Sequence, residues 1–201
     1  MFTGLITGRG TIRRIEARDG AIRFRVESEW IAPKFVLGES ISVNGACMTV
    51  VEFHEADSGF SFEASQESLA VTTLSHLRLG DRVHLERALH LGDSMGGHLV
   101  TGHIDGIGSL ASRSEEGSCL RLDLSVAASL LRYFIPKGSV SIDGVSLTVN
   151  TIDDEHGTFS VMLIPHTLSL THFAQLVVGD SVNIEVDLLG KYVERLLGPR
   201  V

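Results

Sequence analysis

The sequence predicts an all-β protein made of two similar small barrels in tandem, followed by a short C-terminal helix. The main observation is a repeat, because SISVNGACMTV at residues 40–50 returns as SVSIDGVSLTV ninety-nine positions later. Short runs of alternating apolar and polar residues, separated by glycines and acidic residues, are typical of antiparallel strands. Asn44-Gly45 and Asp143-Gly144 lie inside such runs, where a tight turn or a bulge would bend a sheet toward a closed barrel.

The repeat covers most of the chain at a constant offset. Outside the central motif the matching pairs are Phe60-Ser61 with Phe159-Ser160, Leu69 with Leu168, Gly80-Asp81 with Gly179-Asp180, and Glu86 with Glu185. With a gap of one residue, the opening MFTGLI also matches LVTGHI at 99–104. We therefore expect an N-terminal domain with its linker at 1–97 and a C-terminal domain at 98–187, each about the size at which a domain can bury its own core.

The expected strands of the first copy, and the helical turns of both copies, follow from the spacing of apolar residues. Strands are expected where apolar residues alternate with polar ones, at 12–15, 21–26, 40–50, 59–64 and 82–87. Three segments between strands have a spacing that suits a short helical turn: 67–74, 127–134 and 167–173. Residues 89–97, LHLGDSMGG, contain three glycines and no clear period, which predicts a linker between the domains.

The C-terminal segment 188–201 predicts a helix over 188–197. Its apolar residues are spaced as on one helical face: Leu189, Tyr192, Val193, Leu196 and Leu197. A helix this short is not stable alone, so it must pack on its own barrel or on the same segment of another subunit. The sequence leaves both possibilities open.

Composition excludes several classes of protein. The formal charge is -8, from 17 Lys and Arg against 25 Asp and Glu, so there is no basic field to bind nucleic acid. No apolar run approaches the roughly 20 residues that span a membrane. MFTGLITGRG lacks the charged region of a signal peptide, and a cytoplasmic location is expected. Cys47 and Cys119 are not equivalent in the repeat, which argues against a duplicated disulfide framework.

Equivalent positions with different chemistry are the best candidates for function. The changes are Leu5 to His103, Gly38 to Lys137, Cys47 to Ser146, Glu67 to His166, Ser68 to Thr167 and Ala88 to Asp187, whereas Thr49 and Thr148 are the same. Two cavities of one shape and unequal chemistry suit a protein that binds two copies of one ligand and treats them differently. Drift after duplication explains such changes equally well, but these cluster at reactive residue types beside glycines and turns.

Two histidines and the Cys47/Ser146 pair are the reactive candidates. His98 and His103 are five apart, so in a regular strand they would face opposite sides unless a bulge intervenes. No third ligand with metal-site spacing accompanies them, so acid–base catalysis or hydrogen bonding to a ligand is expected rather than a metal. Cys47 and Ser146 offer a thiol and a hydroxyl at one position, without a GxSxG elbow or a phosphate-binding glycine loop.

The chain resembles the riboflavin synthase family, alpha-chain type. The motifs that carry the resemblance are MFTG, NGACMTV, GGHLVTGHIDG, KGSVSIDGVSLTV, LIPHTL and NIEVD. The resemblance implies two six-stranded Greek-key barrels, a C-terminal helix that forms homotrimers, and sites between the first barrel of one subunit and the second of its neighbour. It also implies that two molecules of 6,7-dimethyl-8-ribityllumazine give riboflavin and 5-amino-6-ribitylaminopyrimidinedione, without metal or redox cofactor.

The resemblance also implies the site residues. Those matching catalytic or substrate-contacting positions are Phe2, Cys47, His98, His103, Ser146, Thr148 and Asp187. First-barrel ligand segments are Gly4, Leu5, Ile6, Cys47, Met48, Thr49, Glu63, Ala64, Ser65, Gln66, Glu67 and Ser68. Those of the second barrel are Gly102, His103, Ile104, Lys137, Ser146, Leu147, Thr148, Met162, Leu163, Ile164, Pro165, His166 and Thr167. His166, His172 and Ser68 depart from the residues usual in the family.

The chemistry leaves the individual roles open. The acidic 7-methyl group of a lumazine needs a base, either His103 or a hydroxyl relay through Thr148. The second lumazine needs a nucleophile at its C7, for which Cys47, Ser146 and water are candidates. Two rival functions remain, a lumazine- or flavin-binding protein without turnover, and a flavoenzyme of another β-barrel type. The two histidines favour the synthase over a non-catalytic binder.

Overall fold

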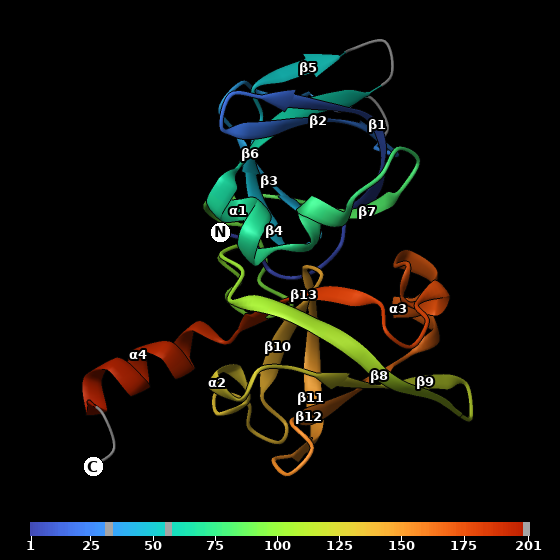
Figure 1. Ribbon diagram of the computed structural model, residues 1–201, viewed down its shortest axis with the longest axis vertical. Helices are drawn as coiled ribbons and strands as arrows, with labels where there is room; N and C mark the ends of the chain where they lie inside the picture. The colour runs from blue at the N-terminus through green and yellow to red at the C-terminus, as the bar shows by residue number, and fades with distance from the viewer. Residues whose placement is uncertain (31–33, 55–57, 199–201) are drawn as a thin grey trace.

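A computed structural model describes residues 1–30, 34–54 and 58–198. Its two β domains lie one above the other in Figure 1. The first contains β1 (Gly8–Arg18), β2 (Ala21–Ser28), β3 (Ser40–Val43), β4 (Ala46–Thr49), β5 (Glu52–His54), β6 (Gly59–Ser65) and β7 (Arg82–Arg87). The second contains β8 (Gly106–Glu116), β9 (Cys119–Ser125), β10 (Ser139–Ile142), β11 (Val145–Asp153), β12 (Thr158–Leu163) and β13 (Ser181–Val186). The all-β prediction is confirmed.

The second domain is a closed barrel of six antiparallel strands, ordered β10-β11-β12-β9-β8-β13. The connections from β9 to β10 and from β12 to β13 each pass over two strands of the barrel, as in a Greek key. Its core contains Leu122, Leu124, Phe159 and Val161, and Phe134 stacks on Phe159 with ring centroids 4.3 Å apart. The barrel therefore buries a core of its own.

The first domain has the same strand order as the second, except that one of its strands is divided into two segments. Its sheet runs β4-β3-β7-β1-β2-β6-β5, so β4 and β5 together take the place of β11. Val50 and Val51 separate them, and the Val51 N–H donates to Ser61 O at 2.9 Å, which keeps the chain beside β6. The same place in β11 carries a bulge between Val149 and Thr151. The expected six strands are thus present as seven segments, because the irregularity is larger in this copy.

The repeated Asx-Gly dipeptides are two-residue hairpin turns rather than bulges. Val43 pairs with Ala46 across Asn44-Gly45, and Ile142 pairs with Val145 across Asp143-Gly144. All four residues have positive φ, as a type I′ turn requires. The two turns meet where the barrels join, and a Cβ on Gly45 would lie 2.7 Å from the Gly144 backbone nitrogen. Glycine is therefore required there by both the turn and the contact.

The expected helical turns are confirmed. They are α1 (Gln66–Val71) with the 3-10 turn η2 (Thr73–His76), α2 (Ala128–Leu131), and α3 (Pro165–Leu170) with η3 (Phe173–Gln175). The C-terminal helix α4 (Leu188–Leu197) begins at Asp187, whose side chain accepts from the Leu189 N–H. Residues 199–201 of the predicted C-terminal segment lie outside the described residues.

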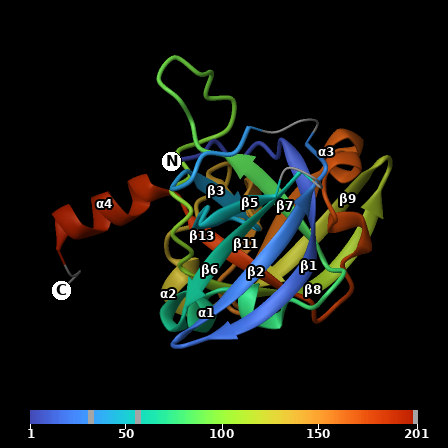
Figure 2. The same ribbon diagram turned by 90° about the horizontal axis from the view of Figure 1, so that it is seen from above.

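Helix α4 extends away from both barrels, as Figures 1 and 2 show. Its contacts with its own domain include an ion pair of Lys191 with Asp105 at 2.7 Å and a hydrogen bond from the Tyr133 hydroxyl to Glu194. Its predicted apolar face is exposed, with Leu196 at 83% and Leu197 at 74%. Within this chain, packing on its own barrel leaves that face uncovered. None of the helices in the described part of the chain has the length and apolar character needed to cross a membrane.

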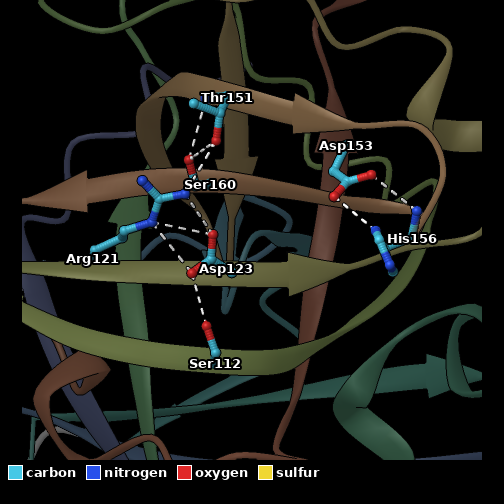
Figure 3. Close-up of polar contacts among 7 residues, drawn as sticks. All are labelled: Ser112, Arg121, Asp123, Thr151, Asp153, His156 and Ser160. Atoms are coloured by element: carbon cyan, nitrogen blue, oxygen red, sulfur yellow. Dashed lines mark hydrogen bonds and ion pairs between the residues drawn. The ribbon is translucent and has the colours of Figure 1, made fainter.

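Polar side chains connect neighbouring strands on the outer wall of the second barrel (Figure 3). Asp123 of β9 accepts hydrogen bonds from Ser112 of β8 and from Arg121, and Arg121 also donates to Thr151 of β11. Thr151 lies 2.5 Å from Ser160 of β12, so the contacts span four strands. Hydrogen bonds from Arg121 lower the pKa of Asp123, which keeps the carboxylate ionised on this wall.

Candidate functional site

Strand alternation places the reactive pair on the outer face of each barrel. In β4, Ala46 and Met48 belong to the core, so Cys47 and Thr49 face outward. Ser146 and Thr148 face outward in the same way on β11. Cys47 and Ser146 are half-buried and the two threonines are exposed. The thiol and the hydroxyl are therefore accessible outside the closed cores.

The segments at the start of each copy, residues 2–6 and 100–104, cross over to the other barrel. We call them the crossing segments. Phe2 and Val100 pair antiparallel, with N–H to O distances of 2.7 and 3.1 Å. Beyond this pairing, Gly4 O accepts from the Ser146 N–H and Gly102 O accepts from the Cys47 N–H, both at 2.8 Å. Ile6 packs on the second core and Ile104 on the first.

This crossing changes the grouping of the predicted ligand segments. The resemblance implies that Gly4, Leu5 and Ile6 belong to the first barrel with Cys47, but Gly4 bonds to Ser146 of the second and the next residues follow it. Gly102, His103 and Ile104 were assigned to the second barrel but lie beside Cys47 of the first. The grouping by barrel is corrected, because the antiparallel backbone bridge between Phe2 and Val100 carries each segment past its own domain.

Glycine is required at both crossing points. Gly4 and Gly102 have φ of 77° and 79°. A Cβ on Gly4 would lie 2.6 Å from the Cβ of Ser146, and one on Gly102 would lie 2.6 Å from the Cβ of Cys47. The backbone therefore reaches the reactive residues more closely than any other residue type allows.

Ser146 lies next to His98. Ser146 Oγ is 2.7 Å from His98 Nδ1, so the two groups share one hydrogen bond whose direction follows the histidine tautomer. Burial lowers the pKa of His98, an effect opposed by the charge of Asp187, and His98 Nε2 is buried with no hydrogen-bond partner among the described residues. A neutral imidazole beside a hydroxyl is suited to accept its proton.

Cys47 lies next to the segment that carries His103. Gly102 touches Cys47, and the following residue, His103, is exposed and donates its backbone N–H to Thr101 Oγ1 at 3.2 Å. His98 therefore contacts Ser146 of the second barrel, whereas His103 follows the glycine that bonds to Cys47 of the first. The spacing of five does not place them on one strand, because the described residues 98–104 form no regular strand and have only an isolated bridge at Val100.

The other predicted ligand segments occupy equivalent corners of the two barrels. Glu63, Ala64 and Ser65 end β6, and Gln66, Glu67 and Ser68 begin α1, where Ser65 Oγ accepts from the Ser68 N–H at 3.2 Å. Met162 and Leu163 end β12, Ile164 precedes α3, and Pro165, His166 and Thr167 begin it. Met48 and Leu147 alternate with the outward residues and pack toward the cores.

Lys137 has an unusual backbone for its residue type. Its φ is +69°, and its equivalent, Gly38, has φ of +83°. Both N–H groups bond to the same place in their barrels, Lys137 to Val149 O at 2.7 Å and Gly38 to Val50 O at 2.9 Å. The second copy therefore keeps the left-handed backbone conformation but has a lysine in place of glycine. A left-handed residue with a side chain is unfavourable, and such residues are typical of functional sites.

Two predicted residues have mainly supporting roles within this chain. Phe2 is completely buried, and its backbone pairing with Val100 holds the two crossing segments together. Asp187 caps α4 and lies close enough to act electrostatically on His98. Sequence reasoning did not identify Glu86 and Glu185 as site residues, although the repeat aligns them.

Two hollows lie near the domain junction, and neither is lined by Cys47 or Ser146. One, of about 810 Å³, includes Thr3, Leu5, Trp30, Lys34 and Glu86. The other, of about 770 Å³, includes Asn44, Thr73, Asp143 and His172. Cys47 and Ser146 therefore lie against the crossing segments and outside the lining of both hollows.

Comparison with known proteins identifies the family. A family model described as "Lumazine binding domain" matches residues 3–88 and again residues 101–187. A riboflavin synthase of Brucella abortus is 41% identical over 199 residues, covering 98% of each chain. The chain belongs to the riboflavin synthase family. Another riboflavin synthase, of Mycobacterium bovis, is 41% identical over 200 residues and 98% of each chain.

The fold of the family is seen in a related solved structure. LumP complexed with riboflavin aligns with a TM-score of 0.82 over 92% of this chain and 99% of LumP, at 26% identity. The two matches of the domain model confirm the predicted tandem repeat, and the closed barrel confirms the predicted architecture.

Proposed function

We propose that this chain catalyses the riboflavin synthase reaction. Two molecules of 6,7-dimethyl-8-ribityllumazine exchange a four-carbon unit, which gives riboflavin from one and 5-amino-6-ribitylaminopyrimidinedione from the other. The observation that carries the proposal is identity of 41% over nearly the whole length of a riboflavin synthase. The paired sites around Cys47 and Ser146 support it, because one reactant must donate and the other accept.

The two sites suit the two halves of this reaction. The neutral His98 can take the proton of the Ser146 hydroxyl, or of a water in its place, as either adds to C7 of one lumazine. His103, which follows Gly102 beside Cys47, or a hydroxyl relay through Thr148 can remove a proton from the 7-methyl group of a lumazine. Holding the two rings face to face supplies the rest, since orientation contributes about 7 to 11 kcal/mol in well-placed pairs.

We also propose a homotrimer in which the first barrel of one subunit faces the second barrel of its neighbour. The exposed apolar face of α4 supports a contact between subunits, because Leu189, Tyr192 and Val193 are each more than half exposed within one chain. A neighbour would then enclose sites that a single chain leaves open. Sedimentation analysis of Leu196→Glu, expected to yield monomers with lower turnover, tests this arrangement.

Turnover of the lumazine is the direct test. Purified protein mixed with 6,7-dimethyl-8-ribityllumazine is expected to form riboflavin, detected by its fluorescence. Cys47→Ser and His103→Gln are each expected to lower turnover by about tenfold or more. Full turnover by both variants would exclude Cys47 as the nucleophile and His103 as the base.

The rival function is binding of a lumazine or flavin without catalysis. The similarity to LumP, solved in complex with riboflavin, supports this alternative. It predicts that the lumazine binds, with a change in its own fluorescence, but that no riboflavin appears. Binding with no product from the wild-type protein would replace the synthase proposal by this one.

A further inference from the structure

Two buried carboxylates lie under the crossing segments. Glu86 is 3% exposed at the end of β7, and Glu185 is 1% exposed in the equivalent place on β13. Their strand neighbours Leu85 and Ile184 belong to the two cores, so both glutamates point away from the core of their own barrel.

Each carboxylate accepts three hydrogen bonds from a single Thr-Gly pair. Glu86 Oε1 accepts from the Thr3 N–H at 2.7 Å and the Thr3 hydroxyl at 2.6 Å, and Oε2 accepts from the Gly4 N–H at 3.0 Å. Glu185 repeats this with the Thr101 N–H and hydroxyl, both at 2.7 Å, and the Gly102 N–H at 2.9 Å. The two copies therefore keep one arrangement in full.

The threonine hydroxyl also bonds to the residue that follows the Thr-Gly pair. Thr3 Oγ1 accepts from the Leu5 N–H, and Thr101 Oγ1 accepts from the His103 N–H, both at 3.2 Å. Each carboxylate thus orients the backbone of the residue that follows the Thr-Gly pair, which differs between the copies. Leu5 is apolar and His103 is a candidate base.

Burial of these carboxylates is unfavourable in itself. Desolvation raises the pKa of both, and no ion pair of either is found among the described residues. Lys191 has only a minor effect on the pKa of Glu185. A buried carboxylate without an adjacent cation is retained when its oxygens are fully hydrogen-bonded and the arrangement is needed.

We propose that Glu86 and Glu185 are crossed positioning residues. Each is anchored in one barrel and holds a Thr-Gly pair against the reactive strand of the other. Glu86 places Gly4 O on the Ser146 N–H, and Glu185 places Gly102 O on the Cys47 N–H. Glu185 therefore sets the position of His103 relative to Cys47, and Glu86 sets the surroundings of Ser146. The inference deepens the proposed function, since it names what orients the same site.

Thiol labelling tests the assignment independently of catalysis. In a Cys119→Ser background, Cys47 is the only thiol, and its rate of reaction with a disulfide reagent reports whether Gly102 covers it. Glu185→Gln replaces an acceptor oxygen by an NH₂ group opposite N–H donors, and is expected to raise that rate by about tenfold, the effect of losing a hydrogen bond to a charged group. Glu86→Gln is the matched control and is expected to leave it within about twofold.

The reciprocal experiment uses Ser146. In a chain with Cys47→Ser, Cys119→Ser and Ser146→Cys, the introduced thiol is expected to react faster with Glu86→Gln and at an unchanged rate with Glu185→Gln. General loosening of the fold would raise both rates with both variants. That outcome, or no rise with either, overturns the crossed assignment.

A milder pair of variants guards against failure to fold. Thr101→Val removes only the hydroxyl between Glu185 and His103, and is expected to raise Cys47 labelling and to lower kcat by about tenfold. Thr101→Ser keeps the hydroxyl and is expected to match the wild type in both measurements. Equal kinetics and labelling for Val and Ser at this position would contradict the positioning role. Wild-type protein without turnover would refute the proposed function, while the labelling results would still decide the inference.

Discussion

At the scale of single residues, equivalent positions acquire different chemistry from their neighbours. Ser146 shares a hydrogen bond with His98, whose pKa burial lowers, whereas Cys47 meets the backbone of Gly102 and the exposed His103 follows. Thr49 and Thr148 retain the same place on both strands. In the proposed reaction, unequal treatment of two identical ligands would depend on a few side chains at the crossing segments, and not on a different fold for each half.

Lys137 gives a prediction at this scale. Lys137→Gly copies the equivalent Gly38 and relieves a left-handed residue, so the free energy of unfolding is expected to rise by about 1 kcal/mol. The same change removes the cation and is expected to weaken lumazine binding. Chemical denaturation and fluorescence titration measure the two effects. Greater stability together with unchanged affinity would exclude Lys137 from the site.

At the scale of elements, the two Asx-Gly turns are responsible for the close contact between the barrels. Their backbones approach until a Cβ on Gly144 would lie 2.8 Å from Gly45 N. The turn type could be predicted only as one of two alternatives, because Asn-Gly suits a type I′ turn and a bulge equally well in an alternating run. The observed register, with Val43 opposite Ala46, selects the turn.

Gly45→Ala tests the contact. Positive φ alone costs about 1 to 2 kcal/mol for a residue with a Cβ, and the clash with Gly144 adds to this. Gly20→Ala is the matched control, because Gly20 has φ of 70° in a hairpin turn with nothing within 4 Å of an added Cβ. We expect Gly45→Ala to lower the free energy of unfolding by at least about 1 kcal/mol more than the control. Equal losses would show that the turns do not support the junction.

At the scale of the whole molecule, a buried polar network joins the barrels. His84 Nε2 accepts from the His172 N–H, so Nδ1 carries the proton and donates to Asp143 O, both at 3.0 Å. Asn183, the equivalent of His84, makes the same two bonds: its Oδ1 accepts from the Thr73 N–H and its Nδ2 donates to Asn44 O, both at 2.7 Å. An amide and a neutral imidazole thus make equivalent hydrogen bonds across the junction of the two barrels.

Only the imidazole can be protonated, which predicts acid sensitivity. Burial, and then the charge of His172, lower the pKa of His84 well below its usual value, while its bond to Asp143 opposes this. The unfolded chain therefore binds the proton first, and stability is lost as pH falls below about 6.5, by about 1.4 kcal/mol per pH unit until the folded pKa is reached. Arg9 also disfavours the charged form, and the ring of His172 stacks on His84 at 3.9 Å.

His84→Asn reproduces the side chain of the equivalent position and is expected to remove this contribution. His98 adds a slope of the same sign, and Glu86 and Glu185, whose pKa values are raised, add slopes of the opposite sign at lower pH. The difference between variant and wild type cancels these. Unfolding measured from pH 7 to pH 5 is expected to show a shallower loss for the variant, and identical slopes would exclude His84 as the cause.

The sequence by itself determined the duplication, the alternating strands, the helical turns and the residues that differ between the copies. These follow from local periodicity and from comparison of one half with the other. Tertiary structure decided which barrel each crossing segment lies against, that His98 bonds to Ser146, and that Glu86 and Glu185 each bond to a Thr-Gly pair. The physical reason is that the two barrels offer nearly identical strands for Gly4 and Gly102. The choice therefore depends on long-range contacts, the backbone pairing of Phe2 with Val100 and the bonds to Glu86 and Glu185, which local sequence does not show.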